Sequence, residues 1–179
     1  MYYAHSPCLN QAKNCGVEIF YIPLNKSLLP NTEDIDMFRA VEDIVMVGYP
    51  NGLWDSINNK PIFRRGTTAT HIKFDYNGKK EFLIDATCFP GSSGSPVFIL
   101  NEGAFTDKNG NGYIGNKVYL IGVLYAGPQH TTSGEVKTID APTAQKDIVI
   151  STIPNNLGII IKYERLLEIE NILKDLTTQ

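Results

Sequence analysis

Short hydrophobic runs, separated by turn residues, recur along most of the chain. These runs are rich in valine, isoleucine, tyrosine and phenylalanine, which is typical of β-strands. The pattern predicts strands over residues 17–23, 43–49, 62–70, 71–76, 81–84, 96–100, 118–125, 148–153 and 157–162. Many short strands with few helices favour an all-β protein, built as an antiparallel barrel or sandwich.

Turn residues indicate how neighbouring strands pair. Asn77-Gly78 is a strong hairpin signal between the runs 71–76 and 81–84. A glycine-rich loop predicts a second pair, formed by 96–100 and 118–125. Pro154-Asn155-Asn156 predicts a third pair, formed by 148–153 and 157–162. The only clear helical stripe lies at the end of the sequence, within 163–176, with apolar residues at Leu166, Leu167, Ile169, Ile172, Leu173 and Leu176.

Composition narrows the class of protein. The chain has 179 residues, enough for one ordinary domain or two small barrels. With 42% hydrophobic and 20% charged residues, it is expected to be globular. The net charge of −3 without a basic block argues against a nucleic-acid partner, and no apolar run is long enough to span a membrane. The odd set of Cys8, Cys15 and Cys88 gives no disulfide framework.

The clearest candidate for chemistry is the segment 90–96, Pro-Gly-Ser-Ser-Gly-Ser-Pro. A nucleophilic serine needs a base to take its proton and donors to hold the oxyanion that forms. Small residues allow the backbone to turn sharply, so that its amides point at one spot while the hydroxyl stays accessible. The segment therefore predicts Ser93 as a nucleophile, with the amides of Gly91 and Ser93 as oxyanion donors. An ordinary glycine- and serine-rich turn is the alternative.

The residues around Ser93 also carry a resemblance to a known family. The segment 84–98, Ile-Asp-Ala-Thr-Cys-Phe-Pro-Gly-Ser-Ser-Gly-Ser-Pro-Val-Phe, resembles the active-serine segment of trypsin-like serine peptidases, and its Pro-Gly and Val-Phe steps resemble the bacterial branch. Residues 119–127 resemble the family strand that ends beside bound substrate. Residues 157–161 resemble the closing strand that precedes the C-terminal helix, and 47–50 resemble the strand that opens the second barrel.

The resemblance implies a fold and a division of the chain. Trypsin-like peptidases have two six-stranded antiparallel barrels, with the serine in the second. The expectation is therefore a complete second barrel with a C-terminal helix over 43–179, a linker over 31–42 and a remnant of the first barrel over 1–30. Exposed apolar surface on an incomplete first barrel would favour self-association.

The resemblance also implies a triad in the order histidine, acid, serine. Residues 18–24 resemble the acid segment, so Glu18 stands where an aspartate is expected; an outward-facing strand glutamate is the alternative. No histidine has the small-residue context of the family. His5 is interpreted as a surface residue, His71 as a strand residue and His130 as a loop residue near the substrate. The chain is therefore expected to begin within the first barrel and to lack the catalytic histidine.

Two further features bear on ligands. The resemblance puts Thr87 at the floor of the specificity pocket, where its lack of charge argues against basic substrates, and it puts Tyr125, Ala126 and Gly127 beside the substrate backbone. Leu124 stands near a position where glutamate-cleaving relatives use histidine, which weakens a glutamyl preference. Residues 107–118 imitate a calcium loop, but the twelfth position, where a glutamate should close the cage, is a valine.

The sequence therefore predicts a trypsin-like serine endopeptidase that is weakly active or inactive as this chain. A non-catalytic peptidase-like domain that binds peptides or protein partners is the alternative. A peptide or protein substrate is expected, and no cofactor or metal. The first five residues lack the pattern of a signal peptide, and the compartment stays open.

Overall fold

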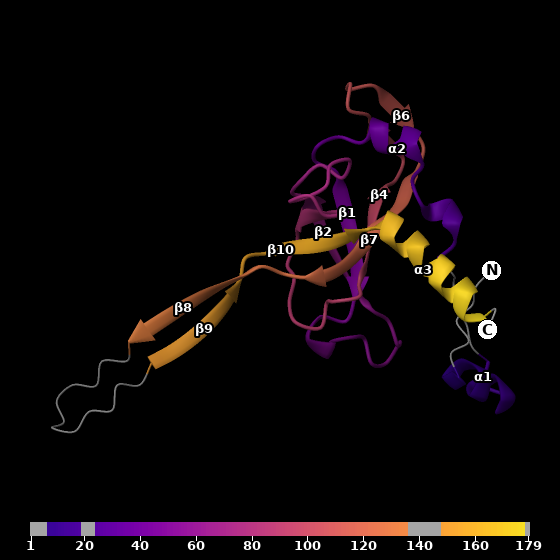
Figure 1. The fold of residues 1–179 in the computed structure, drawn as a ribbon, viewed down its shortest axis with the longest axis vertical. Helices are drawn as coiled ribbons and strands as arrows, with labels where there is room; N and C mark the ends of the chain where they lie inside the picture. Colours follow the sequence, from indigo (N-terminus) through magenta and orange to yellow (C-terminus); the bar gives the residue numbers. More distant parts are fainter. Residues whose placement is uncertain (1–6, 19–23, 136–147, 178–179) are drawn as a thin grey trace.

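A computed structural model describes residues 7–18, 24–135 and 148–177 of the chain (Figure 1). Its helical elements are α1 (Pro7–Asn14), η1 (Lys26–Leu28), α2 (Thr32–Met37), η2 (Pro50–Gly52) and α3 (Tyr163–Thr177). Its strands are β1 (Asp43–Gly48), β2 (Ile62–Thr68), β3 (Glu81–Asp85), β4 (Pro96–Asn101), β5 (Ala104–Thr106), β6 (Gly112–Ile114), β7 (Lys117–Ala126), β8 (Gln129–Glu135), β9 (Ile148–Pro154) and β10 (Leu157–Lys162).

Six of these strands close into an antiparallel barrel in the order β1-β2-β3-β10-β7-β4. Two three-stranded units, β1-β2-β3 and β4-β7-β10, meet along the pairs β1–β4 and β3–β10. The expectation of a mostly β protein with an antiparallel barrel and a C-terminal helix is confirmed. The register of β7 shifts by one residue against β4, between Val97 and Phe98, and against β10, between Ile159 and Ile160, as at β-bulges.

The core fills the barrel interior because alternate residues of each strand point inward. Six of its side chains are fully buried: Phe82, Ile84, Val97, Ile99, Ile121 and Ile160. The isoleucines and valines that signalled strands in the sequence therefore also supply the core. Helix α3 follows β10 directly and packs against β7 and β10.

The segment before β1, expected as a linker over 31–42, packs against the barrel. Helix α2 begins with a capping box between Asn31 and Asp34. Phe38, which follows it, is 1% exposed and belongs to the core, with Ile35 packed beside it. Glu42 is also buried. These residues are therefore part of the folded body.

Two hairpins stand outside the barrel. Strands β5 and β6 pair with each other within the connection from β4 to β7. Strands β8 and β9 form a two-stranded ribbon between β7 and β10, and in Figure 1 this ribbon projects away from the barrel.

Two predicted hairpins are wrong. Residues 71–76 form a turn-rich connection, and Asn77-Gly78 makes only a tight turn closed by the bridge between Tyr76 and Lys79. β9 pairs with β8, whereas β10 pairs with β3 and β7. The predicted pairing of 96–100 with 118–125 is confirmed as β4–β7. Local turn signals therefore located the turns, but the closure of the barrel selected the partners.

Candidate functional site

The segment that carries Ser93 joins β3 to β4 and lies where β1 ends. Ser93 is exposed, whereas its neighbours Ser92 and Ser95 are 1% and 5% exposed. Ser95 packs so closely on Gly48 that a Cβ on that glycine would lie 1.9 Å from the Ser95 Oγ. The end of β1 is therefore in close contact with the turn that carries Ser93.

Backbone hydrogen bonds hold this turn against β7. The Gly94 amide donates to the Leu124 carbonyl at 2.7 Å, and the Leu124 amide donates to the Ser95 carbonyl at 2.9 Å. Gly91 and Gly94 have φ values of 84° and 88°, a conformation that favours glycine. The small residues seen in the sequence are thus required by the sharp turn.

Two amides of the turn remain available to a ligand. The Ser92 and Ser95 amides donate to the carbonyls of Phe89 and Ser92. The amides of Gly91 and Ser93 donate no hydrogen bond within the described part of the chain. These are the two amides that the sequence predicts as oxyanion donors, and both belong to the turn that carries the exposed Ser93.

The Ser93 hydroxyl itself is held by the end of β7. Its Oγ donates to the Tyr125 carbonyl at 3.2 Å. Strand β4 pairs with β7 only as far as Val123, so Tyr125 and Ala126 lie beyond that pairing. On the other side, Ala126 pairs with Ile159 of β10. Two of the predicted substrate-binding residues, Tyr125 and Ala126, therefore lie on the part of β7 that β4 leaves unpaired, and the Tyr125 carbonyl contacts Ser93.

Residues at this edge of β7 also contact the neighbouring strands of the barrel. The Tyr125 hydroxyl donates to Glu81 at 3.1 Å, and desolvation, followed by this hydrogen bond, raises the pKa of Tyr125. Gly127 lies close to the neighbouring backbone, since a Cβ there would be 3.3 Å from the Leu157 carbonyl oxygen. Cys88 packs under Gly127, and burial raises the pKa of its thiol.

Thr87 is exposed, and an arginine lies beside it. Its carbonyl accepts a hydrogen bond from Nη1 of Arg64. The Arg64 guanidinium also lies over the Phe89 ring, 5.1 Å from its centroid. The segment expected to line the specificity pocket is thus in contact with a positive charge.

The connection between β1 and β2 borders the other side of the turn. The Asn51 amide donates to the Pro90 carbonyl at 2.7 Å. A Cβ on Gly91 would lie 3.1 Å from both the Asn51 nitrogen and the Tyr49 carbonyl oxygen, so only glycine fits without strain. Leu53 and Trp54 follow on the same connection and are more than half exposed.

Among the described residues, neither Glu18 nor His71 forms a hydrogen bond with the Ser93 hydroxyl. Glu18 is exposed, in the short segment after α1. His71 is half-buried between β2 and β3, where its Nδ1 accepts from the Lys73 amide at 3.2 Å and its ring packs on Phe74. Burial, followed by the charge of Lys73, lowers the pKa of His71. The backbone of His130 lies in β8 instead of a loop.

Several residues named in the sequence predictions lie outside the described part of the chain. His5 and most of the predicted strand 17–23 lie outside the described residues, as does the side chain of His130. The described side chains therefore include no base within hydrogen-bond reach of the Ser93 hydroxyl.

The loop that imitates a calcium site is closed by its own hydrogen bonds. Asp107 Oδ1 accepts from the amides of Asn109 and Asn111 at 2.8 and 2.9 Å. Its Oδ2 accepts from the Asn111 side chain and from the Tyr113 hydroxyl. Asp107 thus shapes a polar loop, and the described residues contain no cluster of three metal-ligating side chains.

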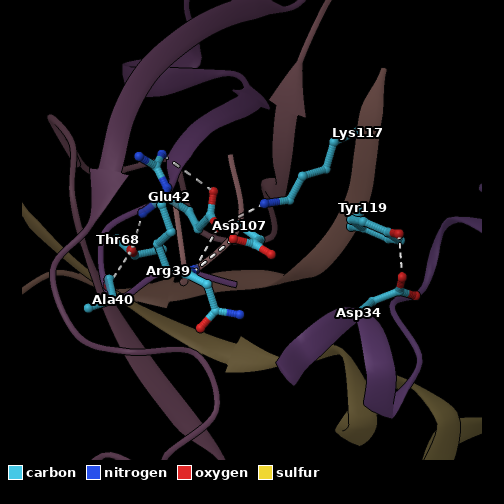
Figure 2. A network of polar contacts seen from close by, with 9 residues as sticks. Asp34, Arg39, Ala40, Glu42, Thr68, Asp107, Lys117 and Tyr119 are labelled. Carbon is cyan, nitrogen blue, oxygen red and sulfur yellow. Dashed lines mark hydrogen bonds and ion pairs between the residues drawn. The ribbon is translucent and has the colours of Figure 1, made fainter. Parts of the chain in front are cut away.

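A buried polar network at the opposite end of β1 was not anticipated from the sequence (Figure 2). Lys117 Nζ donates to Glu42 Oε1 at 2.8 Å, and the two side chains are 5% and 1% exposed. The same carboxylate oxygen accepts from the Arg39 amide at 2.8 Å. Nearby, the Tyr119 hydroxyl donates to Asp34 of α2 at 2.6 Å, so the network ties the segment before β1 to the barrel.

Comparisons with protein-family models, with curated proteins and with solved structures found no match for this chain. Within the described residues, no helix is both long and apolar enough to cross a membrane.

Proposed function

We propose that this chain carries the nucleophile-bearing barrel of a trypsin-like serine endopeptidase, with Ser93 as the nucleophile. The observation that carries the proposal is the conformation of the turn around Ser93. It combines an exposed hydroxyl with two unpartnered amides, those of Gly91 and Ser93. Oriented backbone amides of this kind stabilise the negative oxygen that forms when a hydroxyl attacks a carbonyl.

The edge of β7 supports a peptide as the substrate. An extended peptide binds to a free strand edge through backbone hydrogen bonds. Tyr125 and Ala126 lie at such an edge, and the Tyr125 carbonyl is within 3.2 Å of the Ser93 hydroxyl. A peptide paired there would present a carbonyl to Ser93. Because Arg64 contacts Thr87 and Phe89, the surface beside Thr87 would disfavour basic side chains.

Activity is expected to be low. A general base contributes about 10² to 10⁴ in rate. The Ser93 hydroxyl donates to a carbonyl, which cannot take its proton, so nothing among the described side chains activates it. The same observation favours a second candidate function, a non-catalytic domain that binds peptides at the β7 edge.

A fluorophosphonate probe tests the nucleophile directly. Incubation of the chain with the probe, followed by mass spectrometry, should show slow modification at Ser93 that is lost in Ser93→Ala. The matched control is Ser56→Ala, an exposed serine between β1 and β2, which should leave the modification rate unchanged. Modification no faster than that of a simple serine peptide would contradict the proposal.

The oxyanion donors are tested by a pair of glycine variants. Gly91→Ala adds a Cβ at a φ of 84° and against the Tyr49–Asn51 backbone, so it should slow modification of Ser93. Gly103→Ala has nearly the same φ, 83°, outside the turn, and controls for backbone strain alone. Equal modification rates in the two variants would argue against the Gly91 amide. Saturable peptide binding without any modification would favour the non-catalytic function.

A further inference from the structure

A cavity lies far from Ser93, between the β5–β6 hairpin and the end of the barrel. It has a volume of about 540 Å³, which is in the range of sites that hold small ligands. Asp43, at the start of β1, and Asn101, at the end of β4, both line it. Ser93 lies beyond the opposite ends of the same two strands, so a strand length of about 17 Å separates the two places.

Two polar groups of the cavity wall have no partner. Arg39 and Asn101 both line the cavity. The Nε of Arg39 and the Oδ1 of Asn101 are buried without a hydrogen bond. An unsatisfied buried donor or acceptor costs free energy, which a bound ligand recovers if it supplies the missing partner through small side-chain rotations. A ligand that carries both an acceptor and a donor would satisfy these two groups.

The charged residues at the cavity indicate which acceptor group a ligand would carry. Lys117, behind the wall, is already paired with Glu42 at 2.8 Å. Arg39 is 3.8 Å from the same carboxylate and keeps 40% of its side chain exposed, so its guanidinium can bind an anion. Asp43 lines the cavity as well and would repel a group with two or more negative charges. A single carboxylate fits this balance better than a phosphate does.

Most of the remaining lining, apart from Thr106, presents apolar surface. The rings of Phe105 and Tyr113 are stacked, with centroids 5.3 Å apart. Ile114, which also lines the cavity, is 99% exposed. A fully exposed isoleucine beside two aromatic rings offers a surface for an apolar side chain of the ligand.

We propose that this cavity binds the C-terminal residue of a peptide chain. The terminal carboxylate accepts from the Arg39 guanidinium, and the amide N–H of the same residue donates to Asn101 Oδ1. The side chain of that residue packs on Phe105, Tyr113 and Ile114. The site is independent of Ser93 and of the chemistry proposed there.

Fluorescence anisotropy on the full chain tests the proposal. The probes are two pools of fluorescein-labelled octapeptides with a randomised last residue, one with a free C-terminal carboxylate and one with a C-terminal amide. The free-acid pool should bind saturably, and the amide pool about tenfold more weakly or worse, because a charge-assisted hydrogen bond is lost. An N-acetylated leucine competitor distinguishes the terminal residue alone from a longer peptide.

Variants give an independent readout. Arg39→Gln should abolish the preference for the free acid, and Ile114→Ser should weaken binding without lowering the melting temperature. Ile57→Ser, at a residue that is 92% exposed between β1 and β2, is the matched control and should change neither. Absence of binding, equal affinity for acid and amide, or an unaltered preference in a folded Arg39→Gln variant would each overturn the proposal.

Discussion

The buried ion pair between Glu42 and Lys117 allows a specific prediction about the free energy of unfolding. Its side chains are 1% and 5% exposed, and their 2.8 Å contact joins residues 75 positions apart. Removing Lys117 leaves the buried Glu42 carboxylate with the Arg39 amide at 2.8 Å and the more distant Arg39 guanidinium at 3.8 Å. Lys117→Met keeps the length and volume of the side chain, so the change isolates the loss of charge.

The cost follows from the burial of the pair. Breaking a buried ion pair by removing one partner typically costs about 3–5 kcal/mol. For a chain of this size, each kcal/mol lowers the melting temperature by about 2–4 °C, so Lys117→Met should melt roughly 6–20 °C lower. The hydrogen bond from the Arg39 amide remains on the Glu42 carboxylate, which favours the lower part of this range.

A double-mutant cycle separates the pair from its surroundings. Thermal and urea unfolding would be followed for Lys117→Met, Glu42→Gln and the double variant. Because the double variant contains no buried charge, it should lose less stability than Lys117→Met alone. The control is Lys73→Met, which breaks the pair with Asp36 at 2.6 Å between side chains that are nearly half exposed. That variant should unfold close to the unmodified chain, because water screens the charges.

Two outcomes would refute this reasoning. A loss below about 1 kcal/mol in Lys117→Met would mean that water or a neighbouring group compensates the carboxylate. A double variant whose loss equals the sum of the single losses would mean that the two residues do not interact.

Two further predictions concern Tyr119 and Gly48. Burial, followed by the hydrogen bond to Asp34, raises the pKa of Tyr119 to about 12 from 10.0, so the folded chain holds this proton more tightly than the unfolded chain. Its contribution to stability should therefore be complete below pH 10.0 and be lost as the pH rises toward about 12; urea unfolding at several alkaline pH values should show a shallower decline for Tyr119→Phe. Gly48→Ala should destabilise the fold by about 1–3 kcal/mol, because the new Cβ would overlap Ser95. Gly112→Ala, where a Cβ meets nothing within 4 Å, is its control, and equal melting temperatures in the two variants would contradict the packing argument.

Much of the local structure could be predicted from the sequence. Most elements begin and end within two residues of the predicted runs, among them β1, β2, β3, β4, β7, β10 and α3. Strands have a period of two and helices a period of 3.6, so the spacing of apolar residues reveals both. The turn around Ser93 was also predictable, because a backbone with two left-handed residues favours glycine at 91 and 94.

The partners of these strands were decided only by the tertiary structure. Asn77-Gly78 does make a turn, yet β3 pairs with β2 and β10 instead of with residues 71–76. A closed barrel requires each strand to have a neighbour on both edges, and this global condition overrides the local signal.

The polar network and the cavity beside the β5–β6 hairpin depend on the tertiary structure still more strongly. Nothing in the sequence around Glu42 or Lys117 indicates that their side chains are buried or paired. They become a buried pair because the barrel brings the start of β1 and the start of β7 to the same end, where Lys117 also lies over the Phe38 ring. Sequence patterns report what neighbouring residues prefer, whereas burial and pairing over 75 positions arise only when the chain closes on itself.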